Sequence, residues 1–145
     1  MNKVNIYVFA RFHAFDLARE LIKEGKLNKV SSTYPFFIAK KWGIPRKKFR
    51  SRFLFEILIR INRKFKLFND NEFSNFLKFI NAKLNILDSK KASIHISWSG
   101  SSFHLFKKLK KDNSNILILE RGSTHQLYQN QILNEEYSSF KLNYE

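Results

Sequence analysis

The sequence has no cysteine, and only two prolines, four glycines and one methionine in 145 residues. Without cysteine, the chain forms no disulfide, thiolate metal site or cysteine nucleophile. No apolar run approaches the roughly 20 residues that a membrane-spanning helix needs. The opening residues also lack the length and cleavage site of a signal peptide. We therefore expect a cytoplasmic protein that can also associate with the inner face of the cell membrane.

Signatures of nucleotide and metal binding are missing as well. No Gly-x-Gly-x-x-Gly follows the first apolar run, and no G-x-x-x-x-G-K-[ST] occurs, so dinucleotide or ATP binding lacks its usual fingerprint. Neither an H-x-x-x-H helix nor an acidic cluster is present. We expect no metal site and no cofactor on this chain.

Large apolar side chains are abundant, and basic ones are concentrated. Hydrophobic residues make up 43% of the chain and include 16 phenylalanines, which argues against disorder and for one core. The formal net charge is +15, and residues 36–68 hold 11 Lys and Arg against the single acid Glu56, a net of +10. Such a block implies a polyanionic neighbour, unless it reflects only a lysine- and asparagine-rich composition.

Apolar patterns predict strands that alternate with helices. Helical spacing follows the first strand and ends at Gly25, and a second helix over 71–87 begins with a capping box of Asn69 and Glu72. This order predicts an α/β fold, a Rossmann-like parallel sheet with helices on both faces. The predicted strands are 4–10, 29–35, 93–98 and 115–119, the last of them buried.

We interpret residues 36–87 as a basic, amphipathic helical insertion into this single domain of residues 1–145. From Phe53 to Ile61 only Glu56 and Arg60 are polar, so a helix there is apolar nearly all round and must be covered by protein or lipid.

The candidate site residues follow the strands. Ligands bind outside the carboxyl ends of parallel strands, where helix N-termini present free N–H groups. Three loops occupy that position, and if their strands are adjacent they converge on one crevice. Their candidate substrate-binding residues are Arg11, His13, Ser99, Gly100, Ser101, Glu120, Arg121, Gly122, Ser123 and His125.

Simpler roles are open for many of these residues. Gly100 and Gly122 can serve only as tight turns, and Ser99, Ser101 and Ser123 are interpreted first as helix N-caps. Ser123 with Gln126 forms an S-x-x-Q capping box. Glu120 and Arg121 can form a local ion pair, and His125 can contact either a helix start or a substrate. We expect His95 and Trp98 to pack inside the protein.

Two strings resemble a known family. "WSGSS", followed about sixteen residues later by "LILERGSTHQLYQNQILNEEY", is similar to the N-terminal half of bacterial family 4 glycosyltransferases of the GT-B fold, as is "YPFFIAKKWGIP". The resemblance runs from Val4 to about Tyr137. The family's glycine-rich loop after the first strand is replaced here by "ARFHAF".

The resemblance implies a role in glycosyl transfer. In such enzymes the N-terminal domain mostly binds the acceptor, a glycan or lipid-linked molecule, and a second Rossmann-like domain binds the nucleotide-sugar donor without a metal. The loops Arg11–Phe15, Ser99–Ser101 and Glu120–His125 would line the acceptor side, with His125 and Arg121 as the candidates for catalysis. Because the donor-binding domain is missing, we expect a separate domain or chain to supply it and no transferase activity from this chain alone.

Two other partners compete with an acceptor. Nucleic acid could bind the basic, aromatic stretch 40–68, but no reader motif is present and an apolar helix tracks phosphates poorly. An anionic membrane surface could instead be met by Trp42, Phe53, Phe55 and the surrounding cations. The candidate membrane or anion patch is Lys40, Lys41, Trp42, Arg46, Lys47, Lys48, Arg50 and Arg52.

Overall fold

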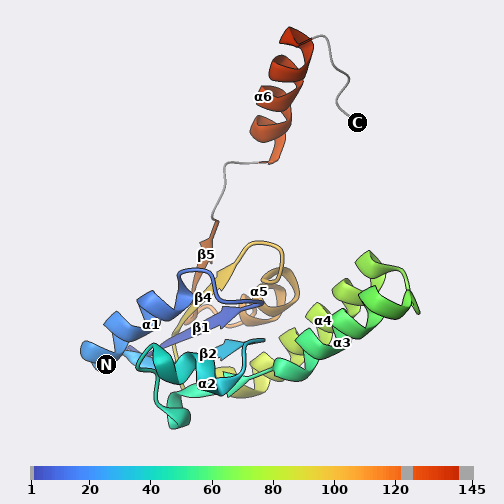
Figure 1. The fold of residues 1–145 in the computed structure, drawn as a ribbon. Coiled ribbons are helices and arrows are strands. Elements are labelled where there is room, and N and C mark those ends of the chain that lie inside the picture. Colours follow the sequence, from blue (N-terminus) through green and yellow to red (C-terminus); the bar gives the residue numbers. More distant parts are fainter. Residues whose placement is uncertain (1, 122–125, 141–145) are drawn as a thin grey trace.

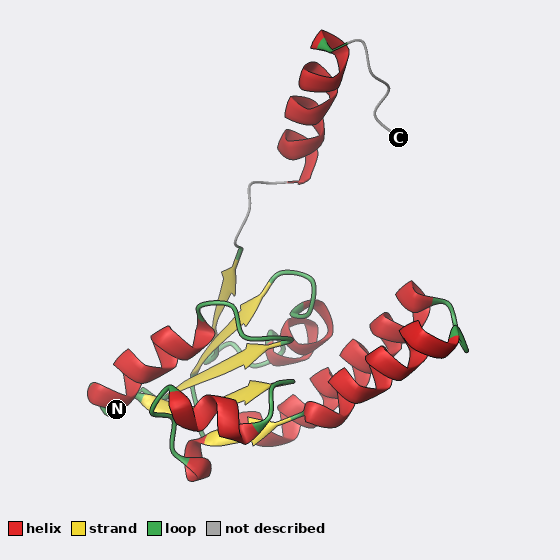
Figure 2. Cartoon of the chain, viewed as in Figure 1, coloured by secondary structure: helices red, strands yellow, loops and turns green. Residues whose placement is uncertain are grey.

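The computed structural model describes residues 2–121 and 126–140, and its centre is a five-stranded sheet (Figure 1). All strand pairs are parallel, and the strand order is β3-β2-β1-β4-β5. The strands are β1 (Val4–Val8), β2 (Leu27–Ser32), β3 (Phe49–Ser51), β4 (Ile94–Trp98) and β5 (Ile116–Glu120). Helices flank the sheet (Figure 2), so the predicted α/β, Rossmann-like class is confirmed.

The helices cover two faces of the sheet. The helices are α1 (Ala14–Lys23), α2 (Phe36–Lys41), α3 (Phe53–Phe65), α4 (Asp70–Ser89), α5 (Phe103–Leu109) and α6 (Gln126–Ser139), with a short 3-10 turn over Arg46–Lys48. None of these described helices is long and apolar enough to cross a membrane. Alternate residues of β1 point to opposite faces of the sheet. Val4, Ile6 and Val8 pack in the core cluster that includes residues of helices α1 and α2, whereas Tyr7 packs against residues of helices α4 and α5.

The predicted helix boundaries hold where capping chemistry defines them. Gly25 has φ +64° and donates its N–H to the carbonyl of Ile22, as a glycine just after a helix commonly does. At the start of α4, the Asn69 side chain accepts hydrogen bonds from the N–H groups of Asn71 and Glu72. Both signals could be read from the sequence because they are local.

Strand β3 lies inside the stretch that the sequence suggested was a helical insertion. It has only three residues, and Phe49 pairs with Val30 and Ser51 with Ser32 of β2. Phe49 is buried against the ring of Phe15. The basic stretch therefore contributes an edge strand and part of the core.

Strand β5 corrects a prediction. The sequence indicated a buried strand, but Ile116, Ile118 and Leu119 are 51%, 42% and 55% exposed. The strand has a partner on one side only, β4, and α6 stands clear of the sheet in Figure 1. An edge strand needs a covering layer on both faces to be buried, and here only Leu117 packs against the cluster that includes Leu105 and Leu109 of α5.

A chain of buried polar side chains crosses the sheet beneath α4 and α5. Asn28 donates to Asn5 (2.8 Å) and Asn5 to the Tyr7 hydroxyl (2.9 Å). Tyr7 lies 3.1 Å from His95 Nδ1, and His95 Nε2 lies 3.1 Å from the Asn115 side-chain oxygen. Since that oxygen only accepts, Nε2 carries the proton and Nδ1 accepts from Tyr7. The predicted packing of His95 is confirmed, and burial lowers its pKa.

Candidate functional site

The strand order reverses between β1 and β4, the position at which an open parallel sheet is expected to have a ligand-binding crevice. Chain connections run outward from β1 through β2 to β3, and then return to β4 on the other side of β1. Ligands of open parallel sheets bind at the carboxyl ends of the strands at such a reversal. The loops after β1 and β4 meet there, as predicted, and β5 adds its end beside β4.

Aromatic rings gather at these strand ends. Trp98, at the end of β4, is only 3% exposed, which confirms that it packs inside the protein. Phe12 stacks parallel to it at 6.5 Å between ring centres, and His13 meets it edge-on at 5.2 Å. Phe12 has φ +42°, a conformation that costs a bulky residue energy and that clusters at functional sites. Sequence reasoning did not single out Phe12.

A carboxylate lies beside the imidazole at the rim. His13 Nε2 and Glu120 Oε1 are 3.9 Å apart, and both side chains are partly exposed. A backbone hydrogen bond also joins the ends of β4 and β5, because the Ser99 N–H donates to the Glu120 carbonyl at 2.8 Å. Among the described residues, Glu120 makes no ion pair with Arg121, so the proposed local pair between neighbours is wrong.

The loop after β4 is a turn whose serines do not cap the next helix. Gly100 has φ +85°, which favours glycine, and the Ser101 hydroxyl donates to the Trp98 carbonyl at 3.3 Å. The residue at the N-cap of α5 is Ser102, without a side-chain cap. The N-cap interpretation of Ser99 and Ser101 is therefore wrong, since the N-cap position is taken by Ser102, the last serine of this run.

Three buried groups near the carboxyl ends of β2 and β4 have no hydrogen-bond partner in the described part of the chain. They are the Trp98 indole N–H, the Ser97 hydroxyl and the Thr33 hydroxyl, the last just beyond the end of β2. Buried polar groups are normally satisfied. Unsatisfied ones at a strand-end crevice are typical of positions that a ligand or water completes.

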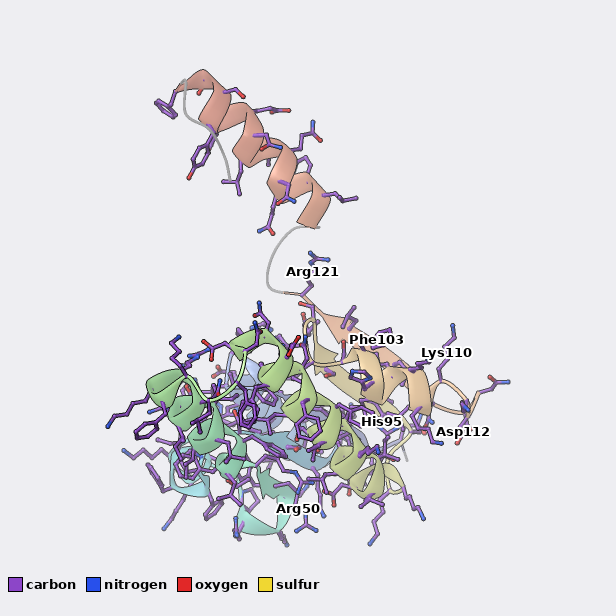
Figure 3. The ribbon with its side chains drawn as sticks, turned by 90° about the vertical axis from the view of Figure 1, so that its right-hand side faces the viewer. Arg50, His95, Phe103, Lys110, Asp112 and Arg121 are labelled. Carbon is purple, nitrogen blue, oxygen red and sulfur yellow. The ribbon has the colours of Figure 1, made fainter. Side chains whose placement is uncertain are left out.

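The remaining predicted site residues are dispersed. Arg11 is exposed and lies over the ring of Trp42 on the side of α2, with 4.7 Å between its guanidinium carbon and the ring centre. Arg121 is exposed just beyond β5 (Figure 3). Gly122, Ser123 and His125 lie outside the described residues, so their predicted roles stay predictions.

The side chains of the predicted anion patch differ in their exposure and in their partners. Lys48 donates to the carbonyl of Leu27 at 2.7 Å, and burial, followed by the nearby cations Lys3 and Lys47, lowers its pKa. Arg50 and Arg52 approach the Asp88 carboxylate of α4 at 3.3 and 3.1 Å. Lys40, Lys41, Arg46 and Lys47 are exposed, whereas Trp42 is half-buried.

The carboxyl ends of β1, β4 and β5 thus combine the exposed ring of Phe12 with the partly exposed imidazole of His13 and carboxylate of Glu120. Such a set can stack on a flat apolar surface and hydrogen-bond hydroxyl groups. Within residues 2–121 and 126–140, no group of three or more His, Asp or Glu side chains could hold a metal ion. Comparison with known proteins finds no matching family model, no similar curated protein and no similar solved structure.

Proposed function

We propose that the chain binds a sugar hydroxyl acceptor for glycosyl transfer in the crevice between β1, β4 and β5. The observation that carries the proposal is the meeting of Phe12, His13, Trp98 and Glu120 from three separate strand ends. Sugar rings have an apolar face that stacks on aromatic side chains and a rim of hydroxyls that needs polar partners. The crevice offers both kinds of contact.

The geometry favours the acceptor over the nucleotide-sugar donor. In Rossmann-like folds the diphosphate of a nucleotide commonly approaches a glycine-rich loop after the first strand, and the loop after β1 instead carries Arg11, Phe12 and His13. An imidazole near a carboxylate can orient a hydroxyl and accept its proton, a role open to His13 and Glu120 at 3.9 Å. The donor would be bound by a separate domain or chain, in agreement with the family resemblance.

Binding of the full chain to a panel of immobilised glycans tests this proposal. We expect at least one glycan to bind, and Glu120→Gln to weaken that binding tenfold or more because the variant cannot accept hydroxyl hydrogen bonds as a carboxylate. The matched control is Glu24→Gln, which alters an exposed carboxylate in the turn before β2. Equal loss in both variants, or no glycan bound, would refute the proposal.

A second candidate function is peripheral association with an anionic membrane. One observation favours it: α3 leaves Leu54, Leu58, Ile61 and Phe65 exposed, at 72%, 41%, 42% and 62%. The sequence predicted that this helix is covered by protein or lipid, and nothing in the described chain covers that face. The α3–α4 pair extends from the sheet in Figure 1.

The cationic side chains of α3 favour a membrane with an anionic surface. Arg60, Arg63 and Lys64 are exposed on the same helix, and each contributes on the order of 1 kcal/mol near an anionic surface. Of the three predicted contact residues, Phe53 is exposed, whereas Trp42 and Phe55 are half-buried; Leu54, at 72%, is more exposed than Phe53.

Sedimentation with phosphatidylglycerol vesicles tests the membrane candidate. Leu54→Glu should abolish sedimentation, while Leu87→Glu, at a leucine of α4 that is equally 72% exposed, should not. Equal behaviour of the two variants, or equal binding to phosphatidylcholine vesicles, would contradict this candidate. Retention of RNA on filters at moderate salt would favour nucleic acid instead.

A further inference from the structure

A concave site lies at the β3 edge of the sheet, opposite the β5 edge. A cavity of about 360 Å³ opens beside β3. In Figure 3, Arg50 of this edge and Arg121 beyond β5 lie at opposite ends of the sheet-bearing part of the molecule. The cavity residues are Lys29, Arg46, Lys47, Phe49, Arg50, Ser51 and Arg52.

The charge of this cavity is unbalanced. Five of its seven lining residues are cationic. Among the described residues, one carboxylate forms ion pairs with these cations: Asp88 lies 3.6 Å from Lys29, 3.3 Å from Arg50 and 3.1 Å from Arg52. Arg46 and Lys47 have no anionic partner in the described chain, which leaves four excess positive charges around one concavity.

The backbone fixes this cluster in place. Arg50 is held by pairing of β3 with β2, opposite Ser31, and Arg52 donates its backbone N–H to the carbonyl of Ser32 at 2.7 Å. Arg46 and Lys47 lie on the 3-10 turn that leads directly into β3. Cations anchored on secondary structure keep their spacing without a ligand, which lowers the entropic cost of binding one.

Arg52 shows that the cluster is incomplete. Its side chain is 19% exposed, and its buried Nε has no hydrogen-bond partner in the described residues. A guanidinium presents donors in a fixed fork that matches the oxygens of phosphate or carboxylate. One carboxylate shared by three cations leaves many of their donors unused.

We propose that this cavity binds a phosphate or diphosphate group through Arg46, Lys47 and Arg50, with Lys29 and Arg52 as supporting cations. A doubly or triply charged oxyanion offsets most of the excess charge and accepts several charge-assisted hydrogen bonds at once. The cavity is open enough to admit the phosphate end of a larger molecule. The proposal does not depend on glycan binding in the crevice.

Calorimetric titration of the full chain with inorganic pyrophosphate, at constant ionic strength in chloride, tests the proposal. We expect saturable binding that falls tenfold or more in the double variant Arg46→Gln/Lys47→Gln. Both residues are exposed and make no ion pair in the described chain, so the fold should be retained. The matched control Lys40→Gln/Lys41→Gln removes the same charge from α2 and should bind like the wild type.

Two further binding measurements distinguish a phosphate on a lipid headgroup from a phosphate on a soluble ligand. Vesicles of phosphatidic acid and vesicles of phosphatidylglycerol carry exposed monoester and shielded diester phosphates, respectively, whereas pyrophosphate is free. Competition by pyrophosphate for phosphatidic acid vesicles would assign a lipid headgroup, and binding of pyrophosphate without vesicle binding would assign a soluble ligand. No pyrophosphate binding, or equal loss in the two double variants, would overturn the proposal.

Discussion

The Tyr7 hydroxyl is the link in the buried polar chain whose removal gives the most direct test of the packing. It accepts from Asn5 at 2.9 Å and donates to His95 Nδ1 at 3.1 Å. Tyr7 and His95 are 4% and 1% exposed, and burial raises the pKa of the Tyr7 phenol. Tyr7→Phe keeps the ring and removes only the hydroxyl.

The expected cost follows from what is left unsatisfied. The His95 Nδ1 acceptor loses the Tyr7 hydroxyl as its donor, and an unsatisfied buried group costs about 1–3 kcal/mol. Asn5 retains the carbonyls of Asp88 and Ser89, at 3.4 and 3.5 Å, as weaker acceptors. We therefore expect Tyr7→Phe to lower the free energy of unfolding by about 2 kcal/mol.

Urea denaturation followed by circular dichroism measures this loss. The matched control is Tyr34→Phe, because the Tyr34 hydroxyl makes no hydrogen bond in the described chain although its ring packs against the core. The control should change the free energy of unfolding by less than about 0.5 kcal/mol. Equal effects of the two substitutions would refute the hydrogen-bonded chain.

Three further predictions concern stability. Because burial lowers the pKa of His95, the unfolded state gains the proton first as pH falls below about 6.5, so the urea midpoint should drop between pH 7.5 and 5.5 and drop less in His95→Gln. Asn69→Ala should cost about 1 kcal/mol by removing the cap of α4, against almost nothing for Asn71→Ala; equal thermal midpoints would contradict this. Asp88→Asn should cost about 2 kcal/mol by leaving Arg52 unpaired, and pyrophosphate should restore part of the melting temperature in calorimetry; a wild-type melting temperature would exclude it.

The fold was predictable where the signal is local and strong. The apolar runs of β1 and β4 and the stop at Gly25 all appear as expected. The three-residue strand β3 was missed because two of its residues are Arg50 and Ser51, which carry no strand pattern. Burial of β5 was overestimated because an apolar run says nothing about whether another layer of the protein covers it.

The sequence predicted where in the fold the candidate site lies, but not most of the side-chain contacts within it. Parallel strands imply that their end loops meet, and His13 and Glu120 do meet. The stacking of Phe12 on Trp98 depends on the positive φ of Phe12, which no sequence pattern predicts. The role of Asp88 among three cations joins residues up to 59 positions apart, and a single sequence carries no signal for such a pairing.

Nitrogen–proton correlation spectra of the full chain, titrated with a glycan that it binds, test the central claim most directly. Binding in the crevice predicts the largest chemical-shift changes at the backbone amides of Phe12, His13 and Ser99, together with the indole N–H of Trp98. Changes confined to the β3 edge or to α3, with these signals unmoved, would contradict acceptor binding at the carboxyl ends of β1, β4 and β5.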